Sequence, residues 1–267
     1  MNHASAGEQF QRLTEIVARL RAPGGCPWDR EQTNESILPS LIEEAYEAAG
    51  AIRAGDDANL KEELGDLILV AAMHAEIARE QGRFTIADSL HDVTEKLIRR
   101  HPHVFGESNV LEPEAVVRQW EAIKRTEKTD DSHYLASLPD ALPALMRAQK
   151  AQKKVARVNF DWDNLGDVIA KVEEELGETK EAIAAQDQAA IQNELGDLLF
   201  AVVNLARKCG IDAEDALQRG VDKFRGRFNR LEDELTAQGK RLGNVDLPEL
   251  DAIWNKVKRD EKAGSPA

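Results

Sequence analysis

The amino-acid sequence predicts an all-α fold made of two tandem helical-bundle domains. Apolar residues recur at helical spacing along almost the entire chain, beginning with Phe10, Leu13 and Val17. The sequence has no convincing alternation of apolar and polar residues and no Asn-Gly or Asp-Gly hairpin signal, which argues against strands. A pattern of acidic, basic and tryptophan residues also occurs twice in the same order within 267 residues. This duplication predicts two domains of ordinary size.

The helical spacing predicts five helices in each half of the chain. Thr85 with Asp88, and Asp212 with Asp215, are typical of helix starts, because a side-chain oxygen there accepts a hydrogen bond from a free backbone N–H. The two starts occupy matching positions of the duplication. The expected helices cover residues 6–21, 34–54, 58–81, 86–99 and 113–128 in the first half, and 143–157, 164–185, 188–208, 213–238 and 248–262 in the second.

A polar stretch from Thr129 to His133 separates the two copies of the pattern, and two prolines follow it. Clusters of this kind are typical of connections between structural elements. We therefore expect an N-terminal domain over residues 1–128, a linker over 129–142 and a C-terminal domain over 143–267.

The composition is that of an acidic globular protein. Binding to nucleic acid or to an anionic membrane needs lysine and arginine to replace counterions, so the net charge of −14 predicts neither partner. The longest apolar stretches are too short to span a bilayer, and the amino terminus lacks the pattern of a signal peptide. Cys26 and Cys209 are too few for a disulfide framework or a cysteine-type zinc site, which predicts a reducing cytoplasm.

The strongest chemical signal is an acidic pattern that occurs twice. In each copy, 19 positions separate the second glutamate of a pair from the glutamate of a second cluster. Clustered carboxylates repel one another unless positive charge lies among them, so the pattern predicts a divalent metal site in each half. The two copies are Glu43-Glu44-x-x-Glu47 followed by Glu63-x-x-Asp66, and Glu174-Glu175-x-x-Glu178 followed by Glu194-x-x-Asp197.

Helix geometry explains how such a pattern can make one site. Residues three apart lie on one face of a helix, so Glu44 can face the same volume as Glu47, and Glu63 the same volume as Asp66. Two antiparallel helices side by side then present four carboxylates to a common centre. Oxygen-only ligation favours magnesium or manganese, whereas the absence of histidine and cysteine argues against zinc. The glycine inside the second cluster of each copy is expected to permit close approach by another helix or a ligand.

Basic and aromatic residues are duplicated along with the acids. The basic pairs are four residues apart on predicted helices, where they can hold phosphate oxygens or pair with a neighbouring acid. The tryptophans suit either core packing or stacking on a nucleobase. The recurring residues are Lys96, Arg100, Trp120 and Lys124 in the first half, and Lys223, Arg227, Trp254 and Lys258 in the second.

Together with Gly25-Cys26-Pro27-Trp28-Asp29 and Arg99-Arg100-His101-Pro102-His103-Val104-Phe105, these features resemble the MazG family of nucleoside triphosphate pyrophosphohydrolases over essentially the whole chain. The resemblance implies an all-α fold of that type and a homodimer. It also implies hydrolysis of ribo- and deoxynucleoside triphosphates to the monophosphate and pyrophosphate, dependent on Mg²⁺ with Mn²⁺ as an alternative. The implied metal ligands are Glu175, Glu178, Glu194 and Asp197, with Glu44, Glu47, Glu63 and Asp66 in the first half, and the implied nucleotide-binding residues are Lys171, Lys223, Arg227, Trp254 and Lys258.

Three features of the site stay open at this point. Glu174 and Glu43 are the candidate general bases, carboxylates outside the implied ligand set that can take the proton from a metal-bound water, and the geometry must decide between them. Ala190 stands four residues before Glu194, where some relatives are expected to carry a lysine, which weakens the case for phosphate contacts from this helix. Intact ligand sets in both halves do not prove two active sites, and we expect the C-terminal half to carry the activity.

Two other classes of protein explain part of the pattern. A ferritin-like di-iron protein also gathers acids inside a helical bundle, but it expects Glu-x-x-His pairs that neither acidic cluster contains. A dimeric helical scaffold whose acids only solvate its surface explains single clusters better than linked, duplicated ones. Tightly bound iron would favour the first alternative, and failure to bind a nucleotide with magnesium would favour the second.

Overall fold

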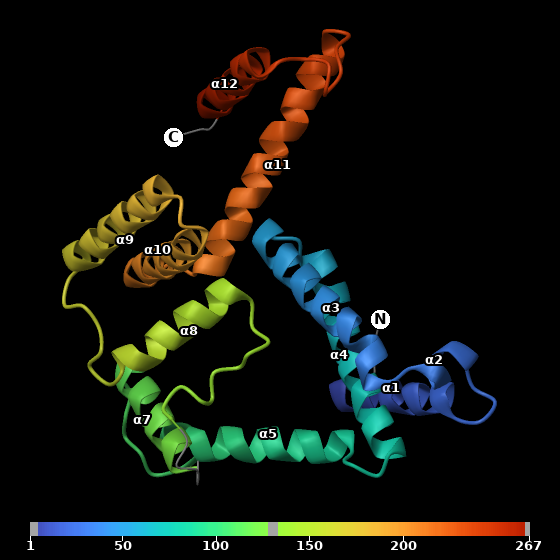
Figure 1. The fold of residues 1–267 in the computed structure, drawn as a ribbon. Helices are drawn as coiled ribbons and strands as arrows, with labels where there is room; N and C mark the ends of the chain where they lie inside the picture. The colour runs from blue at the N-terminus through green and yellow to red at the C-terminus, as the bar shows by residue number, and fades with distance from the viewer. Residues whose placement is uncertain (1–4, 128–132, 265–267) are drawn as a thin grey trace. The chain divides into compact units, whose positions relative to one another are not determined.

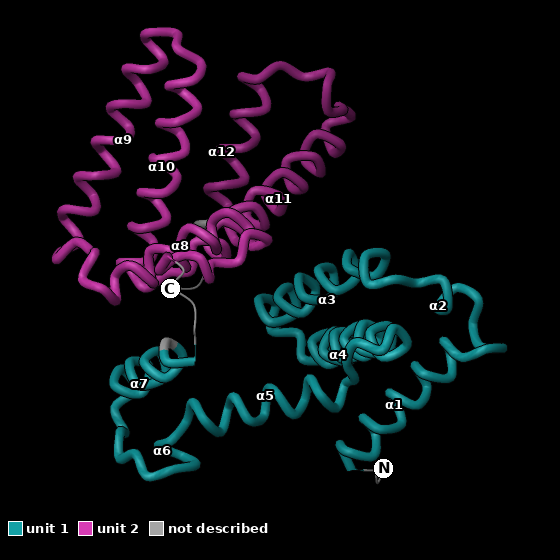
Figure 2. Tube along the Cα trace, turned by 60° about the horizontal axis from the view of Figure 1, so that its bottom comes forward, with its two compact units in different colours: residues 1–130 teal, residues 131–267 magenta. Residues whose placement is uncertain are grey.

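The computed structural model describes residues 5–127 and 133–264, and within these residues it contains helices and no strand. This confirms the expected all-α fold. The chain divides into two compact units, residues 1–130 and 131–267 (Figure 2). Residues 129–132 of the expected linker lie outside the described residues.

The first unit is built on an antiparallel pair of long helices, α3 and α4, against which α1 packs (Figure 1). Helix α5 follows α4, and α7 packs against α5. The helices of this unit are α1 (Ala6–Arg21), α2 (Pro27–Glu31), α3 (Asn34–Ala54), α4 (Asp57–Glu80), α5 (Ile86–Arg100), α6 (Pro102–Phe105) and α7 (Pro113–Thr126).

The second unit repeats this plan. Helices α9 and α10 form the long antiparallel pair, α8 packs against α10, and α12 packs against α11 (Figure 1). The helices of this unit are α8 (Ala144–Ala156), α9 (Leu165–Ala185), α10 (Gln188–Lys208), α11 (Ala213–Ala237) and α12 (Leu247–Gly264).

The predicted helix starts are present. Thr85 accepts from the backbone N–H of Asp88 and forms a reciprocal capping box, and Asp212 accepts from the backbone N–H of Asp215. The short helices α2 and α6 were not predicted. Each begins with a proline, whose missing N–H costs nothing at the first helical position, and each is too short to show a helical period.

The core of the first unit lies between α1, α3 and α4. Val17, Ile37 and Met73 are among its buried members. Beside this core, the Arg21 guanidinium donates to both carboxylate oxygens of Glu80 at 3.0 and 2.8 Å, and it also donates to the backbone carbonyl of Asp29. Arg21 thereby ties α2 to the end of α4.

In the second unit, α8 packs against α10 partly through buried glutamines, whereas α1 packs against α4 in the first unit through apolar side chains. Gln149 donates to the carbonyl of Ile211 at 2.9 Å and accepts from the N–H of Ala213 at 2.8 Å. Gln152 donates to the carbonyl of Phe200 at 2.8 Å. These bonds fix α8 against α10 and the start of α11, while a separate apolar cluster joins α11 to α12.

Helices α5 and α11 carry apolar stripes that the described part of the chain does not cover. No residue of α5 is buried, although Leu90, Val93 and Leu97 share one face. On α11, Leu217, Val221, Phe224 and Phe228 are exposed at the same kind of spacing. A row of large apolar side chains left in water is typical of a surface that another protein covers.

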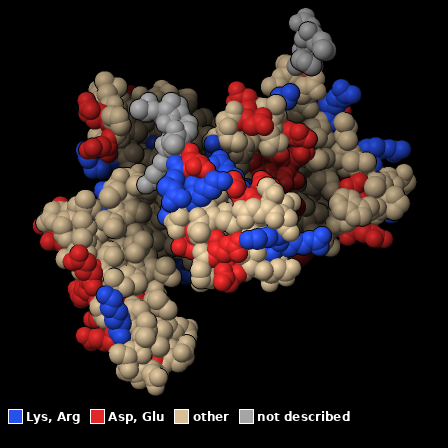
Figure 3. All heavy atoms as spheres, turned by 90° about the horizontal axis from the view of Figure 1, so that it is seen from above, with Lys and Arg blue, Asp and Glu red and all other residues tan. Residues whose placement is uncertain are grey.

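Charge is distributed in small groups over the visible surface. In the view of Figure 3, lysine and arginine side chains alternate with groups of aspartate and glutamate. Within the described residues, no helix combines the length and the apolar character needed to cross a bilayer.

The loop after α1 gives a direct test of the packing. A Cβ atom at Gly25 would lie inside van der Waals distance of the carbonyl oxygens of Leu20 and Arg19. We expect Gly25→Ala to lower the free energy of unfolding by about 1–3 kcal/mol, because backbone atoms must shift to admit the methyl group. The matched control is Gly7→Ala within α1, where the added methyl group meets nothing within 4 Å. Thermal unfolding followed by circular dichroism measures both, and equal midpoints for the two variants would contradict this packing.

Candidate functional site

The helix pairs bring each predicted acidic pattern together in space. One oxygen from each of Glu175, Glu194 and Asp197 lies within 4.8 Å of the others, and the same holds for Glu44, Glu63 and Asp66 in the first unit. We call these groups the second and first acid triplets. Each triplet takes one glutamate from the first helix of the pair and two acids from the second.

The acid triplets are partly withdrawn from water. Glu175 and Glu63 are 6% and 7% exposed, while the other members are more open. Burial and then the negative charge of Asp66 raise the pKa of Glu44. Burial and then the charge of Glu47 raise the pKa of Glu63. The first triplet therefore holds more negative charge than it can easily tolerate without a cation.

Among the described residues, a lysine forms an ion pair with the second triplet and none does with the first. The Lys171 ammonium lies 2.8 Å from a carboxylate oxygen of Glu174 and 2.7 Å from one of Glu175. These two contacts raise the pKa of Lys171 well above its usual range. At the corresponding position of the first unit the sequence has Ser40.

The remaining predicted acids surround the triplets. Glu178 is exposed, and partial desolvation together with the charges of Glu175 and Glu194 raises its pKa. Glu47 is exposed and close enough to Glu44 and Glu63 to raise their pKa values. The candidate bases differ in their contacts. Glu174 is held by Lys171, whereas Glu43 has no hydrogen bond or ion pair to the described residues.

The other predicted nucleotide-binding residues form a separate group where α11 meets α12. Arg227 donates to Glu261 at 2.6 Å, and Trp254 packs against Phe224 with ring centroids 5.3 Å apart. Lys223 is exposed and Lys258 half-buried. Within the described residues, no hydrogen bond or ion pair connects this α11–α12 basic group (Lys223, Arg227, Trp254 and Lys258) to the second acid triplet.

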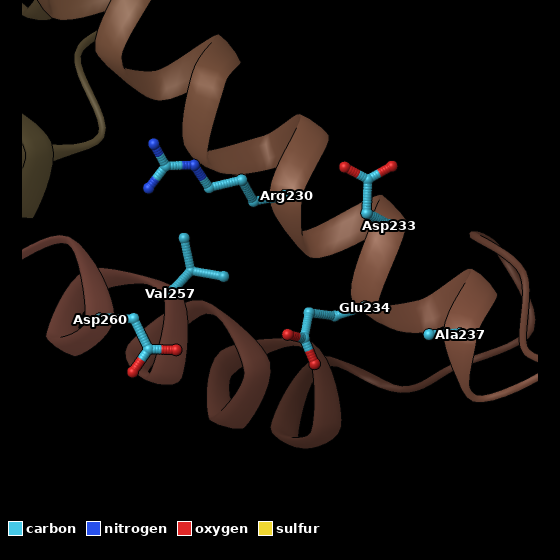
Figure 4. A pocket seen from close by; sticks show the side chains of 6 residues that line it. All are labelled: Arg230, Asp233, Glu234, Ala237, Val257 and Asp260. Carbon is cyan, nitrogen blue, oxygen red and sulfur yellow. The ribbon is translucent and has the colours of Figure 1, made fainter. Parts of the chain in front are cut away.

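A cavity of ≈ 360 Å³ also lies between α11 and α12 (Figure 4). Its charged lining has three carboxylates and one guanidinium, so it repels a polyphosphate. The close-up shows Val257 and Glu234 directed into the gap between α11 and α12, and none of the lining residues belongs to the second acid triplet of α9 and α10. The lining residues are Arg230, Asp233, Glu234, Ala237, Val257 and Asp260.

A smaller cavity of ≈ 70 Å³ adjoins the second acid triplet, and we call it the α9–α10 cavity. Glu175, Asp197 and Lys171 are among its lining residues. Trp162, Phe200 and Asn204 also line it, together with Val168 and Ala201, and the sequence did not predict a role for any of these residues. The signal that would have found Asn204 is a mismatch in the duplication, because the first half has Met73 there.

The donor set of each triplet fits a hard divalent cation. Only carboxylate oxygens are present in either group, which suits Mg²⁺ or Mn²⁺ and lacks the histidine of a ferritin-like site. Gly65 and Gly196 face open space, with no atom within 4 Å of an added Cβ. The expected close approach of another helix is therefore absent from the described chain, and a ligand has free access to this side of each triplet.

The chain matches the MazG nucleotide pyrophosphohydrolase domain twice, over residues 32–105 and 164–231. The chain belongs to the MazG family. Each match contains one complete acid triplet. Membership identifies the protein as a hydrolase of phosphoanhydride bonds and excludes the ferritin-like and scaffold alternatives.

Two relatives align with nearly the whole chain. The nucleoside triphosphate pyrophosphohydrolase of Escherichia coli K12 is 45% identical over 95% of this chain and 98% of its own length. The nucleoside triphosphate pyrophosphohydrolase/pyrophosphatase MazG of Thermotoga maritima is 44% identical over 95% of this chain and 97% of its own. A crystal structure of a MazG-related protein from Thermotoga maritima is 34% identical over 43% of this chain and 98% of that one, with a TM-score of 0.38.

Metal binding is the first property that this geometry predicts. We expect Mn²⁺ to raise the unfolding temperature at pH 7, and to raise it less at pH 5. Protons compete for carboxylates whose pKa values are raised, and the competition strengthens as the pH falls through those values.

Glu175→Gln should weaken one class of Mn²⁺ site at least about tenfold in calorimetry, by analogy with the loss of supporting groups at metal sites. The control is Glu173→Gln, an exposed acid outside the triplets; equal affinities for the two variants would refute the assignment.

Proposed function

We propose that the protein hydrolyses ribo- and deoxynucleoside triphosphates to the monophosphate and pyrophosphate, and that this reaction depends on Mg²⁺, with Mn²⁺ able to replace it. The second acid triplet is the observation that carries the proposal. Its carboxylates adjoin a lysine and a cavity on one helix pair. In a protein with a net charge of −14, a triphosphate can bind only where a cation offsets this charge.

Each residue at the site has a definite part in the proposed reaction. Glu175, Glu194 and Asp197 hold the cation, with Glu178 beside them. When bound, Mg²⁺ neutralises phosphate charge and polarises the phosphoanhydride. With Glu175 holding a cation, the Lys171 ammonium would keep its contact to Glu174 and would offer another of its three donors to a phosphate oxygen.

Glu174 is the better of the two candidate bases. Its carboxylate is fixed at 2.8 Å from Lys171, one residue from the triplet, whereas Glu43 has no such partner among the described residues. A base must be held within hydrogen-bond reach of the water that it deprotonates. In the proposed step Glu174 takes the proton, the water oxygen bonds to the α-phosphorus, and the bond to the bridging oxygen breaks to release pyrophosphate.

We assign the activity to the second unit. Lys171 contacts Glu175 of the second triplet, and the first unit has Ser40 at the corresponding position. The first triplet keeps the ligand set without this phosphate-binding cation. We infer that it binds a divalent ion but turns over slowly.

Product analysis tests the reaction and the choice of unit. Incubation with each triphosphate and Mg²⁺ should yield monophosphate and pyrophosphate, separated by ion-exchange chromatography. Glu175→Gln should lower kcat/KM by about 100-fold or more, because the lost ligand contributes several kcal/mol of charge stabilisation. The matched variant Glu44→Gln should keep most of the activity.

Two results would contradict the proposal. Diphosphate and inorganic phosphate as products would place the cleavage at the wrong bond. Loss of activity in Glu44→Gln, with full activity in Glu175→Gln, would place the reaction in the first unit.

We further propose that the protein is a homodimer whose site combines two chains. The second acid triplet and the α11–α12 basic group are not joined within the described chain. The exposed apolar stripe of α11 and exposed apolar residues of α9 and α10, such as Leu176 and Leu199, both lack cover. A dimer that packs α11 and α12 of one protomer beside α9 and α10 of its partner covers both surfaces and brings the two groups together.

Subunit mixing tests this arrangement. Glu175→Gln removes an acid ligand and Arg227→Ala removes a basic residue, so each variant alone should be inactive. In a mixed dimer one site receives both defects and the other receives neither, provided that the triplet and the basic group come from different chains. Mixing should therefore restore activity toward half that of the intact enzyme per mixed dimer. A mass of 29.6 kDa in solution, or no recovery in confirmed mixed dimers, would contradict the shared site.

A further inference from the structure

A buried asparagine lines the α9–α10 cavity, and its amide nitrogen has no hydrogen-bond partner among the described residues. Asn204 is 3% exposed, and its Oδ1 accepts from Nε and Nη2 of Arg207 at 2.9 and 2.6 Å. Guanidinium groups only donate, so this contact fixes which end of the amide is oxygen. The Nδ2 group donates no hydrogen bond to the described residues, and Asn204 forms part of the cavity wall.

A further ion pair holds this amide in place. Arg207 donates to both carboxylate oxygens of Asp161, at 3.1 and 2.5 Å, and Lys208 lies 3.1 Å from the same carboxylate. Lys208 also donates to the carbonyl of Trp162. The loop before α9 is thereby fastened to the end of α10, so Trp162 and the Asn204 amide keep a fixed relation.

The rest of the cavity suits a planar ring. Trp162 and Phe200 are 41% and 48% exposed, which leaves aromatic surface available for stacking. Asn204 lies seven residues beyond Asp197, or about 10 Å along the helix. When the phosphates of a nucleotide lie at the second acid triplet, the nucleobase lies towards Asn204. The edge of the base that points away from the sugar then reaches the Asn204 amide.

We propose that Nδ2 of Asn204 donates to the keto oxygen on that edge, and that the enzyme thereby prefers keto bases over amino bases. Guanine, hypoxanthine, uracil and thymine carry an acceptor oxygen there, whereas adenine and cytosine carry a donor amino group. An amino group would leave two donors facing each other, and a buried donor without an acceptor is costly. This inference rests on the proposed triphosphate hydrolysis.

The first unit cannot make this contact. The corresponding residue, Met73, is 6% exposed and packs in the apolar core with Val17 and Ile37. Met73 offers no amide donor, so base discrimination belongs to the second unit. Methionine is also a natural replacement for testing Asn204, because this fold already places it at the matching position.

Matched substrate pairs test the proposal. ITP and ATP differ at the keto or amino position, and so do UTP and CTP. Intact enzyme should show kcat/KM about 10- to 100-fold higher for the keto member of each pair, the range expected for one buried hydrogen bond. Asn204→Met should bring both ratios to within about twofold of one through loss on ITP and UTP, while activity on ATP is retained and reports an intact fold.

A second variant tests the orienting contact. Arg207→Met frees the amide to rotate, so it should reduce the same ratios without abolishing ATP hydrolysis. Unchanged ratios in Asn204→Met would overturn the proposal. So would an equal loss on all four substrates, which indicates a structural role or a contact to the sugar. If intact enzyme produces no pyrophosphate from any of them, the proposed function itself fails, and that result is distinct from hydrolysis without base preference.

Discussion

Repulsion between carboxylates is the constraint on which the rest of this structure depends. Two antiparallel helices in each unit place three acid oxygens within 4.8 Å of one another, and one glutamate of each group is almost fully buried. Such an arrangement is costly unless a cation offsets it, and burial makes the cost larger. In the second unit Lys171 supplies part of the offset, yet one ammonium contacting Glu174 and Glu175 leaves Glu194 and Asp197 without it. The remaining negative charge therefore favours binding of a divalent ion, and a bound ion in turn favours binding of a polyphosphate.

The two units share one arrangement of helices but differ in the side chains that surround the acid triplet. In the first unit, α1 packs an apolar core that includes Met73 directly beside the acid-bearing helices. In the second, glutamines of α8 bond to backbone groups instead, and a cavity lined by Asn204 and two aromatic residues remains next to the triplet. Serine in place of Lys171 adds to this difference. Both copies thus hold an acid triplet while the side chains around it differ, and this difference is the basis for proposing that the second unit binds the substrate.

Helical periodicity and capping residues were sufficient to predict the ten long helices, and α3 and α10 begin and end at the predicted residues. The acid triplets were predictable because spacing along a helix determines which carboxylates share a face. Other features depend on contacts that spacing does not encode. Arg227 donates a hydrogen bond to Glu261, which lies on a different helix. Asn204 lies on a helix whose neighbouring residues are apolar, so the sequence around it indicates only core packing. The orientation of its amide depends on Arg207 and Asp161, which are 46 residues apart in sequence.

Diffraction from crystals grown with Mn²⁺ and a non-hydrolysable nucleoside triphosphate, measured at the manganese absorption edge, locates the cation directly. The structure predicts anomalous density between Glu175, Glu194 and Asp197, with the α-phosphate of the nucleotide beside it. Manganese bound elsewhere, for example in the acidic cavity between α11 and α12, with the second acid triplet empty and the nucleotide remote from it, would contradict the assignment of this site.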